Sequence, residues 1–132
     1  MGLTPRVVDS SFSRSSPEGG YEMAKELFRK PIDYTAIFAS TDSNALGIMK
    51  AADEHGIRIP DQLSLIGFDN IPSTALPRIE LTTIEQPKKA MAIQAVEMLL
   101  DKIEHETQGY VHQILMPSLV ERSTCRSIQE DG

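Results

Sequence analysis

Acidic and polar side chains stand directly after two apolar runs of this sequence, where a small polar ligand could be bound. Asp69 follows the run Leu63–Phe68, and Thr41 and Asp42 follow the run Tyr34–Ala39. An ionised carboxylate accepts two or more charge-assisted hydrogen bonds, which suits the vicinal hydroxyls of a sugar or the ring N–H groups of a base. Asp69 could equally end its strand in an Asx turn, and Thr41 and Asp42 could cap a following helix. Residue type and spacing leave both interpretations open.

One aromatic residue, Phe12, stands in an otherwise polar stretch. It could stack on the face of a ligand, although core packing is the more common role for such a residue. The sequence contains no Gly-rich phosphate loop, no G-x-S-x-G and no H-E-x-x-H. Neither Cys125 nor the three histidines stand at a metal-ligand spacing. The pattern therefore favours a binding site, with no metal or cofactor expected.

A helical pattern separates the two apolar runs. Its apolar residues recur on one face: Ala45, Leu46, Ile48, Met49 and Ala52. Thr41 or Asp42 suits the start of this helix, and His55 with Gly56 suits its end. Strand, helix and strand of this length form a βαβ unit, hence a parallel sheet. Ligands of such sheets bind beyond the carboxyl ends of the strands, which is where Asp69 is expected.

The remaining elements are shorter or less regular. Further strands are expected at residues 6–9, 81–85, 111–116 and 119–122, with Pro117 separating the last two. Helices are expected at residues 17–29 and 87–106, the first opened by a capping box of Ser15 and Glu18. Residues 71–80 are expected to form a loop with one helical turn. The later helix carries an apolar stripe: Met91, Ala95, Met98, Leu99 and Ile103.

Composition limits the class of protein. The 132 residues are enough for one domain, and 40% hydrophobic content supplies a core. A net charge of −6 argues against nucleic-acid binding by this segment itself. A single cysteine agrees with a reducing compartment, and neither a signal peptide nor a membrane-length apolar stretch is present. A cytoplasmic protein without a membrane partner is expected. These elements barely cover both faces of a parallel sheet, which indicates part of a larger domain.

From about Val7 to Thr124 the sequence resembles the lactose/galactose repressor (LacI/GalR) family of bacterial transcription regulators. The resemblance rests on Phe12-Ser13 followed by Gly20-Tyr21-Glu22, and on the segments TAIFASTDSNALGIMKAADEHGIRIP, DQLSLIGFDN, LTTIEQP and LVERST. It implies an effector domain of two subdomains, like that of periplasmic sugar-binding proteins of type I. A small molecule would lie in the cleft between the subdomains.

The resemblance also implies roles for individual residues. Effector contacts are expected from Phe12, Thr41, Asp69 and Gln86. Positions at a dimer interface are expected for Leu46, Leu76 and Ile79. Arg78-Ile79-Glu80 stands where the family usually carries proline, which is a departure beside that interface.

The fold expected from the resemblance is an α/β sandwich around a parallel sheet, a partial C-terminal subdomain. Residues 1–124 would form this partial effector-binding and dimerisation domain, and residues 125–132 a polar tail. The helix at 87–106 would normally belong to the N-terminal subdomain, so its apolar stripe is expected to lack its usual partner. The DNA-binding head of the family is absent from these residues.

The function expected is effector sensing and dimerisation in a transcriptional repressor, without enzymatic activity. The effector would be a sugar, sugar phosphate or purine, the partner a second copy, and operator DNA would be bound only through the missing head. A sugar-binding component of an ABC transporter, which shares the fold, is the alternative. A third hypothesis is an enzyme or phospho-acceptor domain that uses Asp42 and Asp69.

Overall fold

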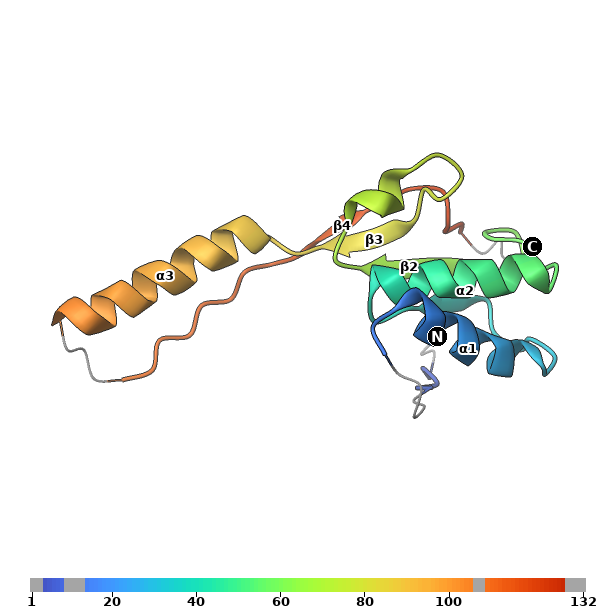
Figure 1. The fold of residues 1–132 in the computed structure, drawn as a ribbon, viewed down its shortest axis with the longest axis horizontal. Coiled ribbons are helices and arrows are strands. Elements are labelled where there is room, and N and C mark those ends of the chain that lie inside the picture. The colour runs from blue at the N-terminus through green and yellow to red at the C-terminus, as the bar shows by residue number, and fades with distance from the viewer. Residues whose placement is uncertain (1–3, 9–13, 106–108, 128–132) are drawn as a thin grey trace.

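The computed structural model describes residues 4–8, 14–105 and 109–127, which form a sheet-and-helix body and a projecting arm (Figure 1). The elements in chain order are α1 (Pro17–Phe28), β1 (Ala36–Phe38), α2 (Asp42–Glu54), β2 (Ser64–Phe68), the 3-10 turn η1 (Pro72–Ala75), β3 (Thr82–Glu85), α3 (Lys88–His105) and β4 (Ser118–Val120). The expected βαβ unit is therefore present as β1, α2 and β2. The single helical turn expected within residues 71–80 is η1.

The four strands form one sheet in the order β1-β2-β3-β4. The first three strands run parallel, with Ile37 opposite Leu65 and Gly67 opposite Thr83. The short β4 pairs antiparallel with β3. The prediction of a parallel sheet is confirmed for β1 to β3, and the last strand makes the sheet mixed.

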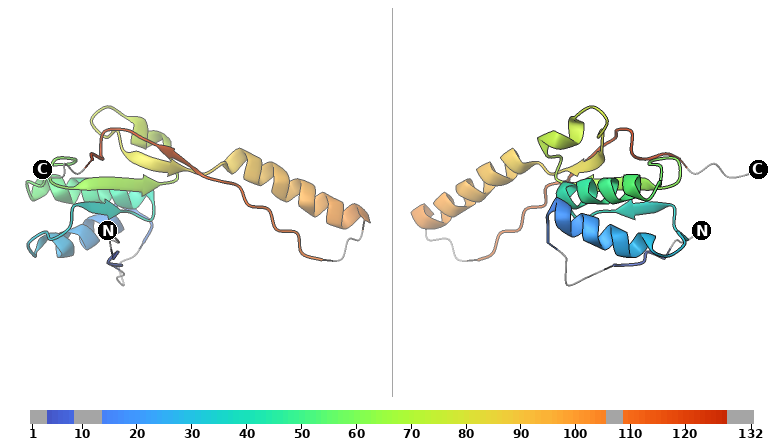
Figure 2. Two further views of the ribbon diagram at one scale, coloured as in Figure 1. Left: turned by 180° about the vertical axis from the view of Figure 1, so that it is seen from behind. Right: turned by 45° about the vertical axis from the view of Figure 1, so that its right-hand side comes forward.

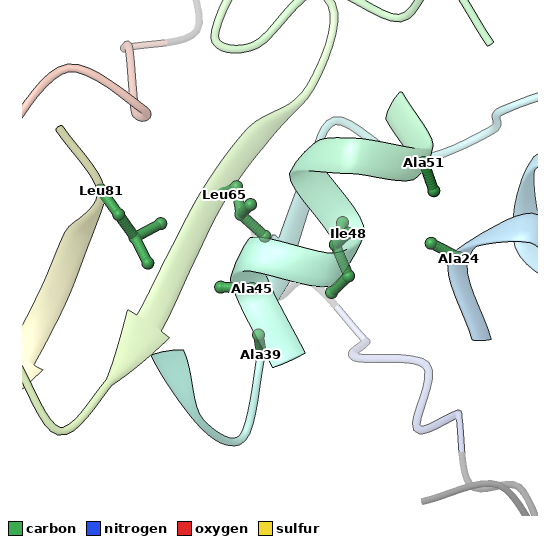
Figure 3. Close-up of a cluster of buried hydrophobic side chains, with 7 residues drawn as sticks. All are labelled: Ala24, Ala39, Ala45, Ile48, Ala51, Leu65 and Leu81. Atoms are coloured by element: carbon green, nitrogen blue, oxygen red, sulfur yellow. The ribbon is translucent and has the colours of Figure 1, made fainter. Parts of the chain in front are cut away.

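The helices α1 and α2 lie together against one face of the sheet (Figures 1 and 2). Figure 3 shows the side chains buried there: Ala24, Ala39, Ala45, Ile48, Ala51, Leu65 and Leu81. Two glycines let the helices approach closely. A Cβ on Gly20 would lie 2.1 Å from the backbone oxygen of Asn44, and one on Gly47 would lie 1.9 Å from that of Pro17. The core therefore depends on small residues at the helix contact.

The helix ends follow the sequence signals with one correction. The hydroxyl of Ser16 accepts a hydrogen bond from the backbone N–H of Gly19 at 3.1 Å, so the predicted capping box at Ser15 is wrong by one residue. Thr41 caps α2, and α2 ends at His55 and Gly56 as predicted, with a positive φ of 69° at the glycine. Only Gly takes that conformation without steric cost.

The opposite face of the sheet is less well covered. Successive residues of a strand point to opposite faces of the sheet, so Ile66 points away from the face on which Leu65 is buried. Phe38 is paired with Ile66 and points to the same, less covered face. Its ring meets that of Phe68 edge-on, with centroids 6.4 Å apart, yet Phe38 remains 61% exposed. The described residues thus leave part of one sheet face open, in keeping with the small number of elements that the sequence predicts.

The helix α3 leaves the sheet after β3 and projects as an arm, and residues 109–117 run back from its far end to β4 (Figures 1 and 2). No residue of α3 is buried, and Leu99 and Ile103 of its apolar stripe are 58% and 66% exposed in the described chain. The strand expected at residues 111–116 is wrong, and so is strand structure at residues 6–8. Neither segment pairs with a neighbouring strand in the described part of the chain. No helix described here is long and apolar enough to cross a bilayer.

The residues after β4 form hydrogen bonds to both β2 and β3. Thr124 is buried, and its hydroxyl donates to the Leu65 carbonyl at 2.7 Å while accepting from the Thr82 N–H at 2.9 Å. The Sγ of Cys125 lies 3.2 Å from the same carbonyl. Arg126 donates to the carbonyl oxygens of Pro60 and Asp61. The first residues of the expected polar tail are thus bonded to β2 and its approach.

Candidate functional site

Asp69 and Gln86 meet at the carboxyl edge of the sheet. Asp69 directly follows β2, and Gln86 directly follows β3. The Gln86 side-chain amide donates to Oδ1 of Asp69 at 2.7 Å. Both residues are half-buried, and within residues 4–8, 14–105 and 109–127 no second side chain bonds to this carboxylate. The parallel pairing of β2 and β3 places these two side chains together. The Asp69 carboxylate can still accept further hydrogen bonds from a ligand.

The backbone at Asp69 makes an unusual turn. Asp69 and the next residue, Asn70, have φ values of 114° and 50°. Such left-handed conformations are rare for residues other than glycine and are found where the surrounding structure enforces them. The Asp69 N–H donates to the carbonyl of Ile84 at 2.9 Å, and its carbonyl accepts from the ammonium group of Lys88. The residue is therefore bonded to β3 and to the first residue of α3.

Asp42, the first residue of α2 in the segment after β1, is fully buried. Its Oδ1 accepts from the Thr83 hydroxyl at 2.5 Å, and its Oδ2 accepts from the Ile71 N–H at 2.9 Å. A phospho-acceptor or a general base must reach its substrate, so the burial of Asp42 argues against the hypothesis that pairs it with Asp69 in catalysis. Asp42 instead joins the start of α2 to the loop after β2 and to β3.

Thr41 and Phe12 are the other residues expected to contact an effector. Thr41 is half-buried, and its hydroxyl accepts from the Asn44 N–H at 3.2 Å as the cap of α2. That bond fixes the hydroxyl at the same sheet edge as Asp69, but no hydrogen bond among the described residues joins the two. Phe12 lies outside the described residues. The effector contacts of Phe12 and Thr41 stay predictions.

Arg122 is part of the site's framework, and sequence reasoning missed it. One guanidinium nitrogen donates to the Asn70 side-chain oxygen at 2.8 Å, and the other donates to the Leu81 carbonyl at 2.7 Å and to the Thr74 hydroxyl at 3.1 Å. The fork of donors on arginine suits such a set of acceptors. The contact with Asn70 spans 52 positions of sequence, so no local pattern could predict it.

A hollow of about 410 Å³ opens beside Gln86, where the arm meets the sheet. Its lining consists of Phe68, Gln86, Pro87, Met91, Gln113, Ile114, Leu115 and Pro117. Apolar walls with a few polar groups are typical of small-molecule sites. The hollow and the neighbouring carboxylate together offer a C–H-rich surface next to hydrogen-bond acceptors, a combination that fits the two sides of a sugar ring.

The residues expected at a dimer interface differ in exposure. Leu76, just after η1, is 52% exposed. Leu46 on α2 is half-buried, and Ile79 is half-buried and packs against the core. Leu76 therefore has the most surface available for a partner, and the interface role of all three stays a prediction.

Curated relatives of known name match most of this chain. A transcriptional regulator from Clostridium butyricum, the HTH-type regulator MalR, is 41% identical over 82% of this chain and 32% of its own length. The HTH-type repressor PurR from Escherichia coli is 39% identical over 88% of this chain and 33% of its own length. The chain thus spans about a third of the length of these relatives.

Solved structures of regulators share the fold. A LacI-family regulatory protein from Corynebacterium glutamicum has a TM-score of 0.71 at 37% identity, covering 84% of this chain and 43% of that one. A LacI-family regulator from Enterococcus faecium with bound ribose has a TM-score of 0.72 at 31% identity, covering 83% and 40%. The lac repressor dimer bound to operator and the anti-inducer ONPF has a TM-score of 0.76 at 29% identity, covering 85% and 39%.

These relatives are transcriptional regulators, which favours the regulator over the transporter component and confirms the resemblance to the LacI/GalR family. The family model for the periplasmic binding protein-like domain matches residues 2–125, nearly the whole sequence. The chain belongs to the family of periplasmic binding protein-like domains, in the form found in LacI/GalR-type regulators.

Proposed function

We propose that this chain is the effector-sensing and dimerisation part of a LacI/GalR-type transcriptional repressor, and that it has no enzymatic activity of its own. The observation that carries the proposal is the hydrogen bond of 2.7 Å between Asp69 and Gln86 at the carboxyl edge of the sheet. It joins a candidate ligand-binding group to the connection between the body and α3.

The effector class follows from the chemistry of this edge. Asp69 supplies a carboxylate acceptor, Gln86 supplies a donor and an acceptor, and the adjoining hollow supplies apolar walls. A sugar, a sugar phosphate or a purine presents polar groups on its rim and apolar or flat faces, so each fits this combination. The ribose in the Enterococcus faecium structure supports the sugar class. Thr41 and Phe12 complete the proposed contacts.

Coupling between ligand and arm would arise from competition for Asp69. A ligand hydroxyl that bonds to the Asp69 carboxylate alters its bond to Gln86, and the Lys88 contact with the Asp69 carbonyl transmits the change to α3. Regulation requires only that the ligand bind one arrangement of the arm more tightly than another. In the longer protein the arm would contact a second subdomain, and its rearrangement would reach the DNA-binding head.

The remaining partners follow from the relatives. The lac repressor is a dimer on its operator, which supports a homodimer here. The residues proposed for its interface are Leu46, Leu76 and Ile79. Operator DNA would be held by residues outside this chain, because these residues carry a net charge of −6. A regulator that binds operators works where the chromosome lies, so we place it in the bacterial cytoplasm.

A thermal-shift screen of the longer regulator against sugars, sugar phosphates and nucleobases tests the proposal. A ligand present at a hundred times its Kd adds about 2.7 kcal/mol to the free energy of unfolding, which raises Tm by several degrees. We expect one chemical class to raise Tm and Asp69→Ala to abolish the rise while DNA binding persists. Asp53→Ala, at an exposed position of α2, is the matched control and should retain the rise. An unchanged effector response in Asp69→Ala would refute the role given to Asp69.

A further inference from the structure

A relay of hydrogen bonds supports the turn that carries Asp69. The Asn70 N–H lies 3.4 Å from the Thr83 hydroxyl, which in turn donates to Oδ1 of Asp42 at 2.5 Å. The Ile71 N–H donates to the other oxygen of Asp42 at 2.9 Å. Two consecutive amides of the turn are therefore held by one side chain from α2 and one from β3.

The relay is buried and tightly fitted. Asp42 and Thr83 are both 0% exposed. A Cβ on Gly67 would lie 2.3 Å from Oδ1 of Asp42, so glycine at that position of β2 makes room for the carboxylate. No described cation lies within salt-bridge distance of Asp42, whose oxygens accept from a hydroxyl and a backbone amide. A buried carboxylate without a cation is costly to folding, and such arrangements are expected where function requires them.

The turn needs this support because its backbone is unfavourable. Asp69 and Asn70 both have positive φ, a conformation that persists when neighbouring groups enforce it. If the chain continued in extended conformation past Phe68, successive side chains would alternate between the two faces of the sheet. The turn instead ends the strand and sets the Asp69 carboxylate against Gln86.

We propose that Asp42 and Thr83 are positioning residues for the effector site: they hold the Asp69–Ile71 turn in the conformation that presents the Asp69 carboxylate at the sheet edge. This inference rests on the proposed function for the identity of Asp69 as the ligand-binding group. Asp42 contacts no ligand in this arrangement and acts through Asp69. Gly67 is needed for the same arrangement, because any larger residue at this position would displace the Asp42 carboxylate.

The experiment uses the isotope-labelled 132-residue chain without ligand. Thr83→Val removes the hydroxyl at nearly constant volume, and Thr83→Ser restores it. Gly67→Ala displaces the carboxylate without removing any hydrogen-bonding group. Amide exchange at Asn70 and Ile71, and the side-chain amide signals of Gln86, are followed by NMR together with amides of the core.

In Thr83→Val we expect exchange at Asn70 and Ile71 to become roughly tenfold faster, the change that follows from losing a hydrogen bond to a charged group. The Gln86 side-chain signals should shift, while amides of α1 and α2 keep their protection. Thr83→Ser should match the unaltered chain, and Gly67→Ala should reproduce the changes of Thr83→Val. A uniform loss of protection throughout the chain, or turn amides unaffected by Thr83→Val, would overturn the inference.

A second measurement covers the case in which the variants do not fold. In the unaltered chain, the three-bond couplings of Asp69 and Asn70 should report left-handed backbone, and the Ile71 amide should be protected. Couplings of extended backbone, or an unprotected Ile71 amide, would overturn the inference by themselves. Because none of these readouts uses a ligand, a turn that responds as expected alongside a failed ligand screen would reject only the proposed function.

Discussion

At the scale of single residues, two aspartates that follow apolar runs of the sequence, Asp42 at the start of α2 and Asp69 directly after β2, have different environments. Asp42 is fully buried and holds neighbouring chain segments, whereas Asp69 is half-buried and bonds to the side chain of Gln86. Each follows an apolar run of the sequence, so residue type and spacing do not show which of the two is buried. The difference arises from the next segment of the chain, which is a helix packed on the sheet after Asp42 and an open turn after Asp69.

Gly47 offers a residue-scale test of the helix contact. Alanine in place of a helical glycine gains about 1 kcal/mol of helix propensity. Here the new Cβ would lie 1.9 Å from the Pro17 oxygen and 2.6 Å from the Tyr21 nitrogen, both backbone atoms that cannot rotate away. Overpacking of about 1–3 kcal/mol or more should therefore prevail, so Gly47→Ala lowers the free energy of unfolding. Urea denaturation measures it, with Asp53→Ala on the exposed face of α2 as control.

At the scale of elements, the segment after β4 bridges β2 and β3. The Thr124 hydroxyl donates to the Leu65 carbonyl and accepts from the Thr82 N–H. Thr124→Val keeps the volume and leaves the buried Thr82 N–H without its acceptor, which should cost about 1–3 kcal/mol. Thr124→Ser keeps the hydroxyl and should lose less. A midpoint of urea denaturation that is the same for Val and Ser would show that the hydroxyl does not hold these strands.

The elements that the sequence predicts well are those with a periodic apolar pattern between clear end signals. The segments that form α2, β2 and β3 have such patterns. Residues 111–116 have strand composition but no partner strand among the residues that the structure describes, and strand propensity counts only where a neighbouring strand and a buried face exist. In the site, Asp69 is predicted from its place after an apolar run and from the family resemblance, whereas Gln86 is predicted from the resemblance alone. The bonds of Asp42 with Thr83 and of Asn70 with Arg122 span 41 and 52 positions, and only the folded sheet brings them together.

At the scale of the whole molecule, the arm leaves apolar surface without cover. Leu99 and Ile103 on α3 are 58% and 66% exposed, and Ile114 on the returning segment is 87% exposed. Exposed apolar side chains that recur along one helix, such as Leu99 and Ile103, favour association. The same arm joins the body beside Asp69, so the partner that covers the arm affects the geometry of the candidate effector site.

This exposed stripe predicts that the 132-residue chain associates with itself, or folds α3 back onto its own sheet. Sedimentation velocity over a range of concentrations should show species larger than a monomer, or a monomer more compact than the arm in Figure 1 allows. Replacing Leu99 and Ile103 with glutamate should give an extended monomer, because charge on the stripe opposes both outcomes. Glu97→Gln, at an exposed position on the same helix, is the control and should leave association unchanged. A monodisperse monomer with α3 extended and solvated in the unaltered chain would contradict the prediction, since water would then cover the stripe without penalty.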